Sequence, residues 1–243
     1  MNERRTRRSS FWKGTRRPRT GTHLVLLILL ALGIRGWLLG HTTVAARDSI
    51  GFIRYAWQLQ TQPQRWRETL RANAHPPLYP LAILAASVPV RQFGSGSEAQ
   101  QMQFSAQLAS AGAGVLLVFP LFFLGRELFG RRVGFWGAAL FQCLPVAARV
   151  TSDALSEGVF LLWTTAALAC AVRGLRVRSV SGFAGCGLFS ALAYLTRPEG
   201  LLTAPAAGLV LLGWQLRPAW RWPWRKTLAC AAALGLVMLM TAG

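Results

Sequence analysis

Residues 22–40, THLVLLILLALGIRGWLLG, decide the fold class, because their length and composition suit a helix that crosses a membrane. Such a helix needs roughly 20 mostly apolar residues to cross the hydrocarbon core of a bilayer, and Arg35 is the only formally charged residue in this stretch. Further apolar stretches lie at residues 102–125, 133–148, 154–172, 180–196, 201–216 and 227–243. The sequence therefore predicts an all-α, polytopic bundle of about seven transmembrane helices.

The composition excludes two other classes of protein. Of the 243 residues, 53% are hydrophobic and only 14% are charged, whereas soluble domains carry about 25% charged residues. The apolar content is also too high for a disordered basic protein. All four cysteines lie in apolar stretches, which predicts small buried side chains and neither a disulfide framework nor a zinc site.

The distribution of charge predicts the orientation of the bundle. If the N-terminal tail at residues 1–21 lies in the cytoplasm, most of the 27 Lys and Arg residues fall in the tail and the short inner loops, as the positive-inside rule requires. A multi-pass protein of the plasma (inner) membrane is the favoured location. Six of the eight acidic residues then lie at the outer face: Asp48, Glu68, Glu98, Asp153, Glu157 and Glu199.

Residues 41–101 form a long outer loop between the first span and the remaining bundle at residues 102–243. Within the loop, the spacing of apolar residues over 49–60 predicts an amphipathic helix. We expect Ile50, Ile53 and Trp57 on its membrane side and Arg54 facing away. The apolar run 78–90 is too short to span, and a crossing there would move the later basic loops outside. We expect a helix that lies on the outer surface or re-enters it.

The net charge of +19 raises the possibility of nucleic-acid binding. Topology already explains most of the basic residues, so we expect no nucleic-acid partner. The basic tail is instead suited to contact with anionic membrane lipids.

Two motifs in the outer loop contain candidate site residues. Asp48 follows the first span directly, where it is suited either to cap the next helix or to act as a base. His75 begins the run His-Pro-Pro-Leu-Tyr-Pro, whose prolines set a sharp entry into the surface helix. His75 is therefore expected beside the membrane, as a structural residue or as a contact for a phosphate group.

Two further motifs lie at predicted outer ends of spans. Asp153 and Glu157 are four residues apart and are expected to share one face of a helix that begins near residue 154. Acidic residues near a helix N-terminus are favourable in any case. Arg197 lies in the tight hairpin Leu-Thr-Arg-Pro-Glu-Gly, as an interfacial residue or a phosphate ligand.

Together these motifs resemble the polytopic GT-C glycosyltransferases, and more closely the superfamily of dolichyl-phosphate-mannose protein mannosyltransferases and lipid A aminoarabinose transferases. The resemblance spans about residues 22–243. It implies transfer of a sugar from a polyprenyl-phosphate carrier to a lipid, glycan or protein acceptor on the non-cytoplasmic face, usually with inversion. The first-loop acid of the family is often followed by Glu, whereas Ser49 follows Asp48 here. This departure argues against a metal held by an acidic pair, so no metal ligand is predicted, and a divalent metal is the one cofactor that the resemblance leaves open.

The resemblance also implies roles for the candidate residues. His75 corresponds to the basic residue before Pro-Pro that is thought to meet the carrier phosphate, and Asp153 to the acid of the later helix. In chemical terms, Asp48 is the best candidate to take the proton from the attacking hydroxyl. The leaving phosphate needs charge stabilisation, which His75, Arg197 or Arg54 is suited to supply.

Two alternatives remain open at this point. A transporter usually carries charged or broken segments near the membrane midplane, which the predicted spans largely lack. A non-catalytic membrane scaffold is the other alternative. The sequence stops inside an apolar helix at Gly243, so we expect an N-terminal portion or a truncated member of the superfamily.

Overall fold

The structure is a computed structural model that describes residues 20–41, 49–73, 75–94, 96–216 and 222–242. These residues form helices and contain no strand, which confirms the all-α prediction. The helices are α1 (Thr20–His41), α2 (Ser49–Thr61), η1 (Pro63–Arg65), α3 (Trp66–Ala72), α4 (Leu78–Phe93), α5 (Glu98–Leu116), α6 (Val118–Phe129), α7 (Arg131–Cys143), α8 (Pro145–Val150), α9 (Glu157–Val177), α10 (Val180–Tyr194), η2 (Pro198–Leu202), α11 (Thr203–Gln215) and α12 (Trp224–Ala242).

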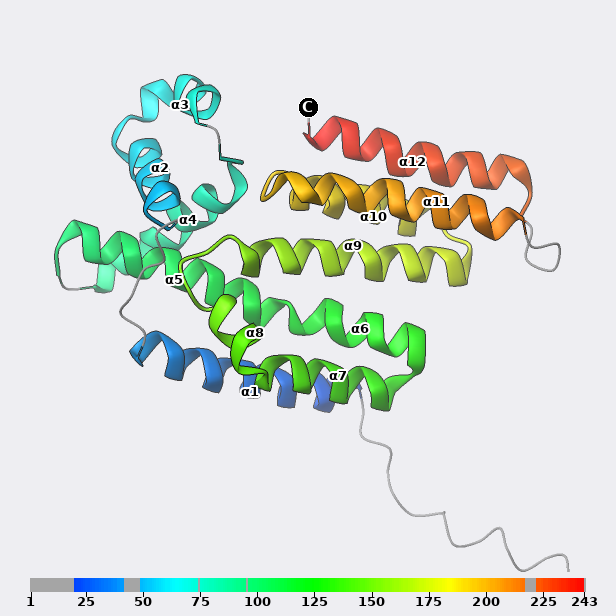
Figure 1. The fold of residues 1–243 in the computed structure, drawn as a ribbon, viewed down its shortest axis with the longest axis horizontal. Coiled ribbons are helices and arrows are strands. Elements are labelled where there is room, and N and C mark those ends of the chain that lie inside the picture. The colour runs from blue at the N-terminus through cyan, green and yellow to red at the C-terminus, as the bar shows by residue number, and fades with distance from the viewer. Residues whose placement is uncertain (1–19, 42–48, 74, 95, 217–221, 243) are drawn as a thin grey trace, which may run out of the picture.

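The long helices run back and forth along one axis of the molecule (Figure 1). The connections α6–α7 and α9–α10, the end of α11 and the start of α12 lie at one end of the bundle, on the right of Figure 1. The α2–α4 segment and the connections that lead into α9 and α11 lie at the opposite end. We call these the basic end and the acidic end, because arginines such as Arg126 and Arg176 belong to the first, and Glu157 and Glu199 to the second.

Three helical segments are long and apolar enough to cross a membrane: Thr20–His41, Glu98–Phe129 and Glu157–Val177. Shorter apolar helices pack beside them, among them α10. Together they form an all-α membrane bundle, with much apolar surface left on the outside for lipid. The number of crossings and the cytoplasmic N-terminus remain predictions.

Three apolar clusters hold the helices together. One joins α9, α10, α11 and α12 around Phe183 and Leu211, and another joins α1, α6 and α7 around Leu27 and Phe122. The third lies towards the acidic end, where Phe52 of α2 and Tyr79 of α4 pack with residues of α5 and α9. This third cluster fixes the outer loop on the bundle, and so it positions the candidate site.

The structure corrects two predicted boundaries. The stretch 133–148 is not one helix, because Leu144 is extended (φ −65°, ψ 120°) between α7 and α8. The cause is Pro145, since the residue before a proline is driven away from the helical region. The helix expected from residue 154 begins only at Glu157. Asp153 therefore lies in the α8–α9 connection and shares no helix face with Glu157.

The two helices predicted in the outer loop are present as α2 and α4, although whether α4 lies on the membrane surface remains a prediction. On α2 the buried residues include Phe52, Tyr55 and Leu59. Arg54 lines the same groove as Ile50 and Trp57, so the expectation that it faces away from them is wrong. Residues i and i+4 of a helix share one face, which places Arg54 with Ile50.

Candidate functional site

The His-Pro-Pro-Leu-Tyr-Pro and Leu-Thr-Arg-Pro-Glu-Gly motifs meet at the acidic end of the bundle. The backbone N–H of Leu78, at the start of α4, donates to the carbonyl oxygen of Leu195 just after α10, at 2.9 Å. Gly200 of η2 packs directly on the backbone of Ala193 and Tyr194, where a Cβ atom would collide. The glycine of the second motif is thus required by a close approach between two segments.

A buried hydrogen-bond chain fixes the α8–α9 connection to the same region. The Tyr79 hydroxyl lies 3.1 Å from the Ser110 hydroxyl oxygen and donates to the carbonyl oxygen of Ala106 at 3.2 Å. The Ser110 hydroxyl donates to the carbonyl oxygen of Leu155 at 2.5 Å. Because the Tyr79 and Ser110 side chains are fully buried, breaking this series of hydrogen bonds would leave buried polar atoms without partners. The chain links α4, α5 and the segment that leads into Glu157.

These contacts enclose a polar pocket of about 230 Å³. Its walls come from α2, the segment just before α4, the segment that leads into α9 with its first residue, and the turn from α10 into η2. We call it the outer pocket, and its lining residues are Phe52, His75, Pro76, Leu155, Ser156, Glu157, Thr196, Arg197, Pro198 and Glu199.

Arg197 lies between two carboxylates in this pocket. Its Nη1 donates to Glu157 Oε1 at 2.7 Å, and its Nη2 lies 3.4 Å from Glu199 Oε1. Burial works to lower the pKa of Arg197, but the hydrogen bonds and charges of Glu199 and Glu157 outweigh burial and raise it. A backbone hydrogen bond and the Arg197 guanidinium lower the pKa of Glu199. Arg197 and Glu199 are therefore both charged at neutral pH.

Glu157 uses only part of its hydrogen-bonding capacity. It is the first residue of α9, where an acidic side chain is stabilised by the helix dipole. Its Oε1 accepts from Arg197, whereas Oε2 is buried and has no hydrogen-bond partner among the described residues. About a third of the side chain (32%) is exposed, and Glu157 lines the outer pocket. The ion pair with Arg197 thus leaves part of the acceptor capacity of the carboxylate unused.

His75 and Phe52 form an aromatic part of the pocket lining. The two rings lie 4.7 Å apart between centroids, and the Phe52 ring meets Tyr79 edge-on at 5.1 Å. A Cβ atom on Gly51 would lie 3.1 Å from His75 Nε2, so the first turn of α2 passes close to the imidazole. The structure thereby brings His75 and Arg197 to one pocket, as expected for two residues of one site.

Of the other predicted site residues, Arg54 and Asp153 do not line the outer pocket. Asp48 falls outside the described residues, although Ser49, which follows it, is fully buried at the start of α2. Arg54 lines a separate groove of about 320 Å³ with Glu98 and Met102. Asp153 lies before Glu157 but does not line the outer pocket. Burial of Asp153 raises the pKa of its carboxyl, partly opposed by the charge of Arg149.

Sequence reasoning assigned no site role to Glu157, Glu199, Thr196 or Phe52. Glu157 and Glu199 were visible as acids at outer helix ends, but the ion pair between Glu157 and Arg197 joins residues 40 positions apart. Arg35 was placed within the first span. It is fully buried, and its Nη2 donates to the Thr151 hydroxyl at 2.8 Å, which ties α1 to the α8–α9 connection.

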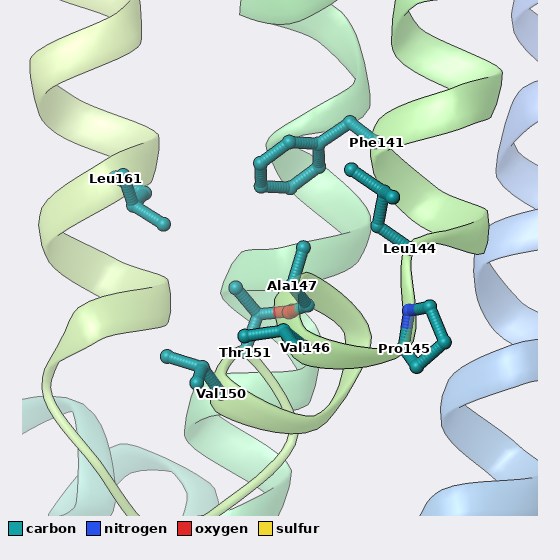
Figure 2. Close-up of a pocket in the computed structure, with 8 residues that line it drawn as sticks. All are labelled: Phe141, Leu144, Pro145, Val146, Ala147, Val150, Thr151 and Leu161. Carbon is teal, nitrogen blue, oxygen red and sulfur yellow. The ribbon is translucent and has the colours of Figure 1, made fainter.

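An apolar groove lies beside the α8–α9 connection, on the flank of the bundle. It has a volume of about 340 Å³, and Figure 2 shows Phe141, Leu144, Val146 and Leu161 around it. Thr151 is the only residue with a polar side chain among those that line this groove. The groove and the outer pocket share one connecting segment but have opposite chemical character.

A metal ion in the outer pocket would have to compete with Arg197 for the carboxylates. In the described part of the chain, no group of three or more His, Cys, Asp or Glu side chains is arranged to hold one. The two carboxylates of the outer pocket are already bridged by the Arg197 guanidinium, which a cation would have to displace. The pocket is better suited to a polar organic ligand with both donor and acceptor groups.

A comparison with families of known proteins identifies the chain. A family model described as dolichyl-phosphate-mannose-protein mannosyltransferase matches residues 75–242, which begin at His75 and include Arg197. No curated protein matches the chain. Because the family match covers more than half of the sequence, the chain belongs to the dolichyl-phosphate-mannose-protein mannosyltransferase family.

Proposed function

We propose that this chain transfers a sugar from a polyprenyl-phosphate carrier to a hydroxyl acceptor at the non-cytoplasmic face of the cell membrane. Family membership indicates a membrane glycosyltransferase. The observation that supports this donor is the convergence of His75 and Arg197, from separate motifs, on one polar pocket at the acidic end. A sugar phosphate on a lipid carrier requires a polar site next to an apolar surface.

The reaction needs a base and a stabilised leaving group. In our proposal Asp48 takes the proton from the acceptor hydroxyl as the oxygen attacks the anomeric carbon. The bond from that carbon to the carrier phosphate breaks, and the phosphate leaves with the bonding electrons. Asp153 lies in the α8–α9 connection, and burial raises the pKa of its carboxyl. It is proposed to position the acceptor.

His75 is the group best suited to meet the carrier phosphate. It makes no ion pair among the described residues, and it lines the outer pocket. Arg197 is different, because two carboxylates already balance its charge. Arg197 would therefore act on the donor through directed hydrogen bonds more than through net charge. Arg54, in its separate groove, is proposed as a second contact for an approaching anionic head group.

The apolar surface for the carrier lies nearby. The groove around Phe141 and Leu161 offers space for part of an isoprenoid chain (Figure 2). The groove and the outer pocket share the α8–α9 connection. An isoprenoid tail bound in the groove would therefore leave the carrier phosphate near the acidic end. The acceptor, whether lipid, glycan or protein, would enter from the aqueous side. The cytoplasmic position of the N-terminus is part of the same proposal.

A transfer assay tests this function. Purified protein in lipid nanodiscs receives radiolabelled polyprenyl-phosphate sugars, and transfer to a hydroxyl acceptor is measured. We expect Asp48→Asn to reduce the rate about 10²–10⁴-fold, the range for a lost general base. Glu68→Gln, on the exposed helix α3, is the matched control and should retain full activity.

Two results would contradict the proposal. Equal rates for the wild type and Asp48→Asn would remove Asp48 from the mechanism. If the wild type transfers no sugar from any polyprenyl-phosphate donor, the reaction itself is wrong, and a non-catalytic membrane scaffold becomes the better account.

A further inference from the structure

The outer pocket is small, and its two walls differ in chemistry. At about 230 Å³ it lies below the range of roughly 300–1,000 Å³ typical of sites for drug-sized ligands. Phe52 and His75 give one wall an aromatic surface, which suits the C–H face of a ring. Glu157, Arg197 and Glu199 give the other wall charged acceptors and donors. A single compact ring with polar edges fits such a space.

The charges of the pocket favour a neutral ligand over a free anion. Two carboxylates face one guanidinium, so these three groups carry one excess negative charge. A free phosphate would gain little from this wall, because Arg197 is already paired. A ligand with hydroxyl groups gains more, since each O–H donates to an ionised acceptor in a charge-assisted hydrogen bond.

Glu157 has the unused capacity that such a ligand requires. An ionised carboxylate offers about four lone-pair sites, and the ion pair with Arg197 occupies one of them at Oε1. About a third of the side chain (32%) is exposed, in the pocket. Arg197 also holds the carboxylate in a fixed orientation, which lowers the cost of ordering it around a ligand.

We propose that the outer pocket is a subsite for one polyhydroxylated sugar ring, in which Glu157 accepts hydrogen bonds from ring hydroxyls and Arg197 is the positioning residue that orients Glu157. This inference rests on the proposed function and deepens it, because it assigns the sugar ring to Glu157 and Arg197, in the same pocket where His75 is proposed to meet the carrier phosphate. The ring can belong to the donor or to a glycan acceptor, and the two sources share this chemistry.

Ligand binding tests the inference without any transfer reaction. Saturation-transfer NMR on the full chain in nanodiscs measures dissociation constants for the 1-phosphates of mannose, glucose and arabinose, for their methyl glycosides, and for inorganic phosphate. We expect at least one ring probe to bind the wild type, and Glu157→Gln to weaken that binding about tenfold, the effect of one lost charge-assisted hydrogen bond. Preference for the 1-phosphate identifies the donor as the source, and preference for the glycoside identifies the acceptor.

Matched variants and analogues make the result specific. Glu68→Gln makes the same chemical change on an exposed residue (78%) outside the pocket and should bind as the wild type does. Glu157→Asp, which withdraws the carboxylate from Arg197, should also weaken binding. Removing the recognised hydroxyl from the ring should weaken binding to the wild type but have little further effect in Glu157→Gln, whereas a merely structural role would leave both proteins equally sensitive.

The inference is overturned if no ring probe binds the wild type, if Glu157→Gln binds the ring as well as the wild type does, or if inorganic phosphate alone binds. Failure of the proposed function looks different. Ring binding that depends on Glu157, without transfer from any lipid donor, would leave the subsite standing and remove the reaction.

Discussion

Each end of the bundle carries a group of three charged residues, and the ratio of acidic to basic residues is reversed between the two ends. At the basic end one carboxylate, Glu127, lies between two arginines, 3.4 Å from Arg126 and 3.6 Å from Arg176. At the acidic end one arginine, Arg197, lies between Glu157 and Glu199. The residue types are the same, but the excess charge has the opposite sign.

The comparison shows that an ion group alone does not make a site. At the basic end the predicted topology accounts for the arginines, and the ion pair with Arg176 joins the end of α6 to the end of α9. At the acidic end the ion group lines the same pocket as His75, and Oε2 of Glu157 has no hydrogen-bond partner among the described residues. What distinguishes the acidic end is the space beside the charges together with unused hydrogen-bonding capacity.

The largest expected effect is on the rate of sugar transfer, which should fall when an arginine of the acidic end is replaced but not when one of the basic end is. Arg197→Gln should reduce sugar transfer by about 10²-fold, because it removes directed donors and leaves two carboxylates facing each other in the pocket. Arg176→Gln, the equivalent change at the basic end, should alter the rate less than twofold. Initial rates in the transfer assay measure both. Equal losses in the two variants would mean that the pocket has no special role.

The next effect concerns the stability of the acidic end. Gly200→Ala should lower the free energy of unfolding by about 1–3 kcal/mol, since its Cβ would collide with the backbone at Ala193 and force it to move. Gly213→Ala, which meets nothing within 4 Å in helix α11, should leave stability unchanged or raise it. Thermal unfolding in detergent compares the two. A Gly200→Ala protein as stable as the wild type would contradict the close packing of the motif on α10.

A smaller loss is expected from the buried hydrogen-bond chain. Tyr79→Phe removes the hydroxyl that contacts Ser110 and Ala106, and should cost about 1 kcal/mol of stability. Tyr194→Phe is the control, because the Tyr194 hydroxyl makes no hydrogen bond within the described residues. If the two variants melt at the same temperature, the buried hydrogen bonds of Tyr79 contribute nothing to the attachment of α4.

The smallest effect is a dependence of stability on pH. The raised pKa of Asp153 means that the folded state binds its proton more tightly than the unfolded chain does. Ionised Asp153 therefore destabilises the fold at neutral pH, and this penalty disappears as pH falls through the folded pKa. Asp153→Asn should raise the melting temperature at pH 7 and lose that advantage in acid.

Glu199, whose pKa is lowered, should show the reverse trend, so Glu199→Gln should lower the melting temperature at pH 7 and not in acid. Profiles with the same sign for both variants would contradict these assignments.

Much of the fold follows from the sequence, because apolar length and Lys/Arg distribution act locally. Helices α2 and α4 were predicted close to their observed bounds. The break at Leu144 was missed, although Pro145 was its visible signal. The late start of α9 was missed because acids at 153 and 157 fit a helix N-terminus equally well in either position.

The candidate site was less predictable, since it depends on contacts between distant segments. His75 and Arg197 could be selected because each lies in a motif. The pairing of Arg197 with Glu157 depends on how α9 and η2 pack, which no local pattern encodes. The burial of Arg35 against Thr151 was hidden for the same reason. Arg54 was assigned by charge alone, and packing places it in another groove.

The central claim is that the acidic end faces outward and handles the sugar. Cysteine labelling in intact cells tests its topology most directly, with Glu68→Cys on exposed α3 and Arg132→Cys on exposed α7, both in a Cys143→Ser background. A membrane-impermeant maleimide should label the cysteine at 68 in intact cells and the one at 132 only after lysis. Labelling of position 132 from outside, with position 68 protected until lysis, would contradict the account.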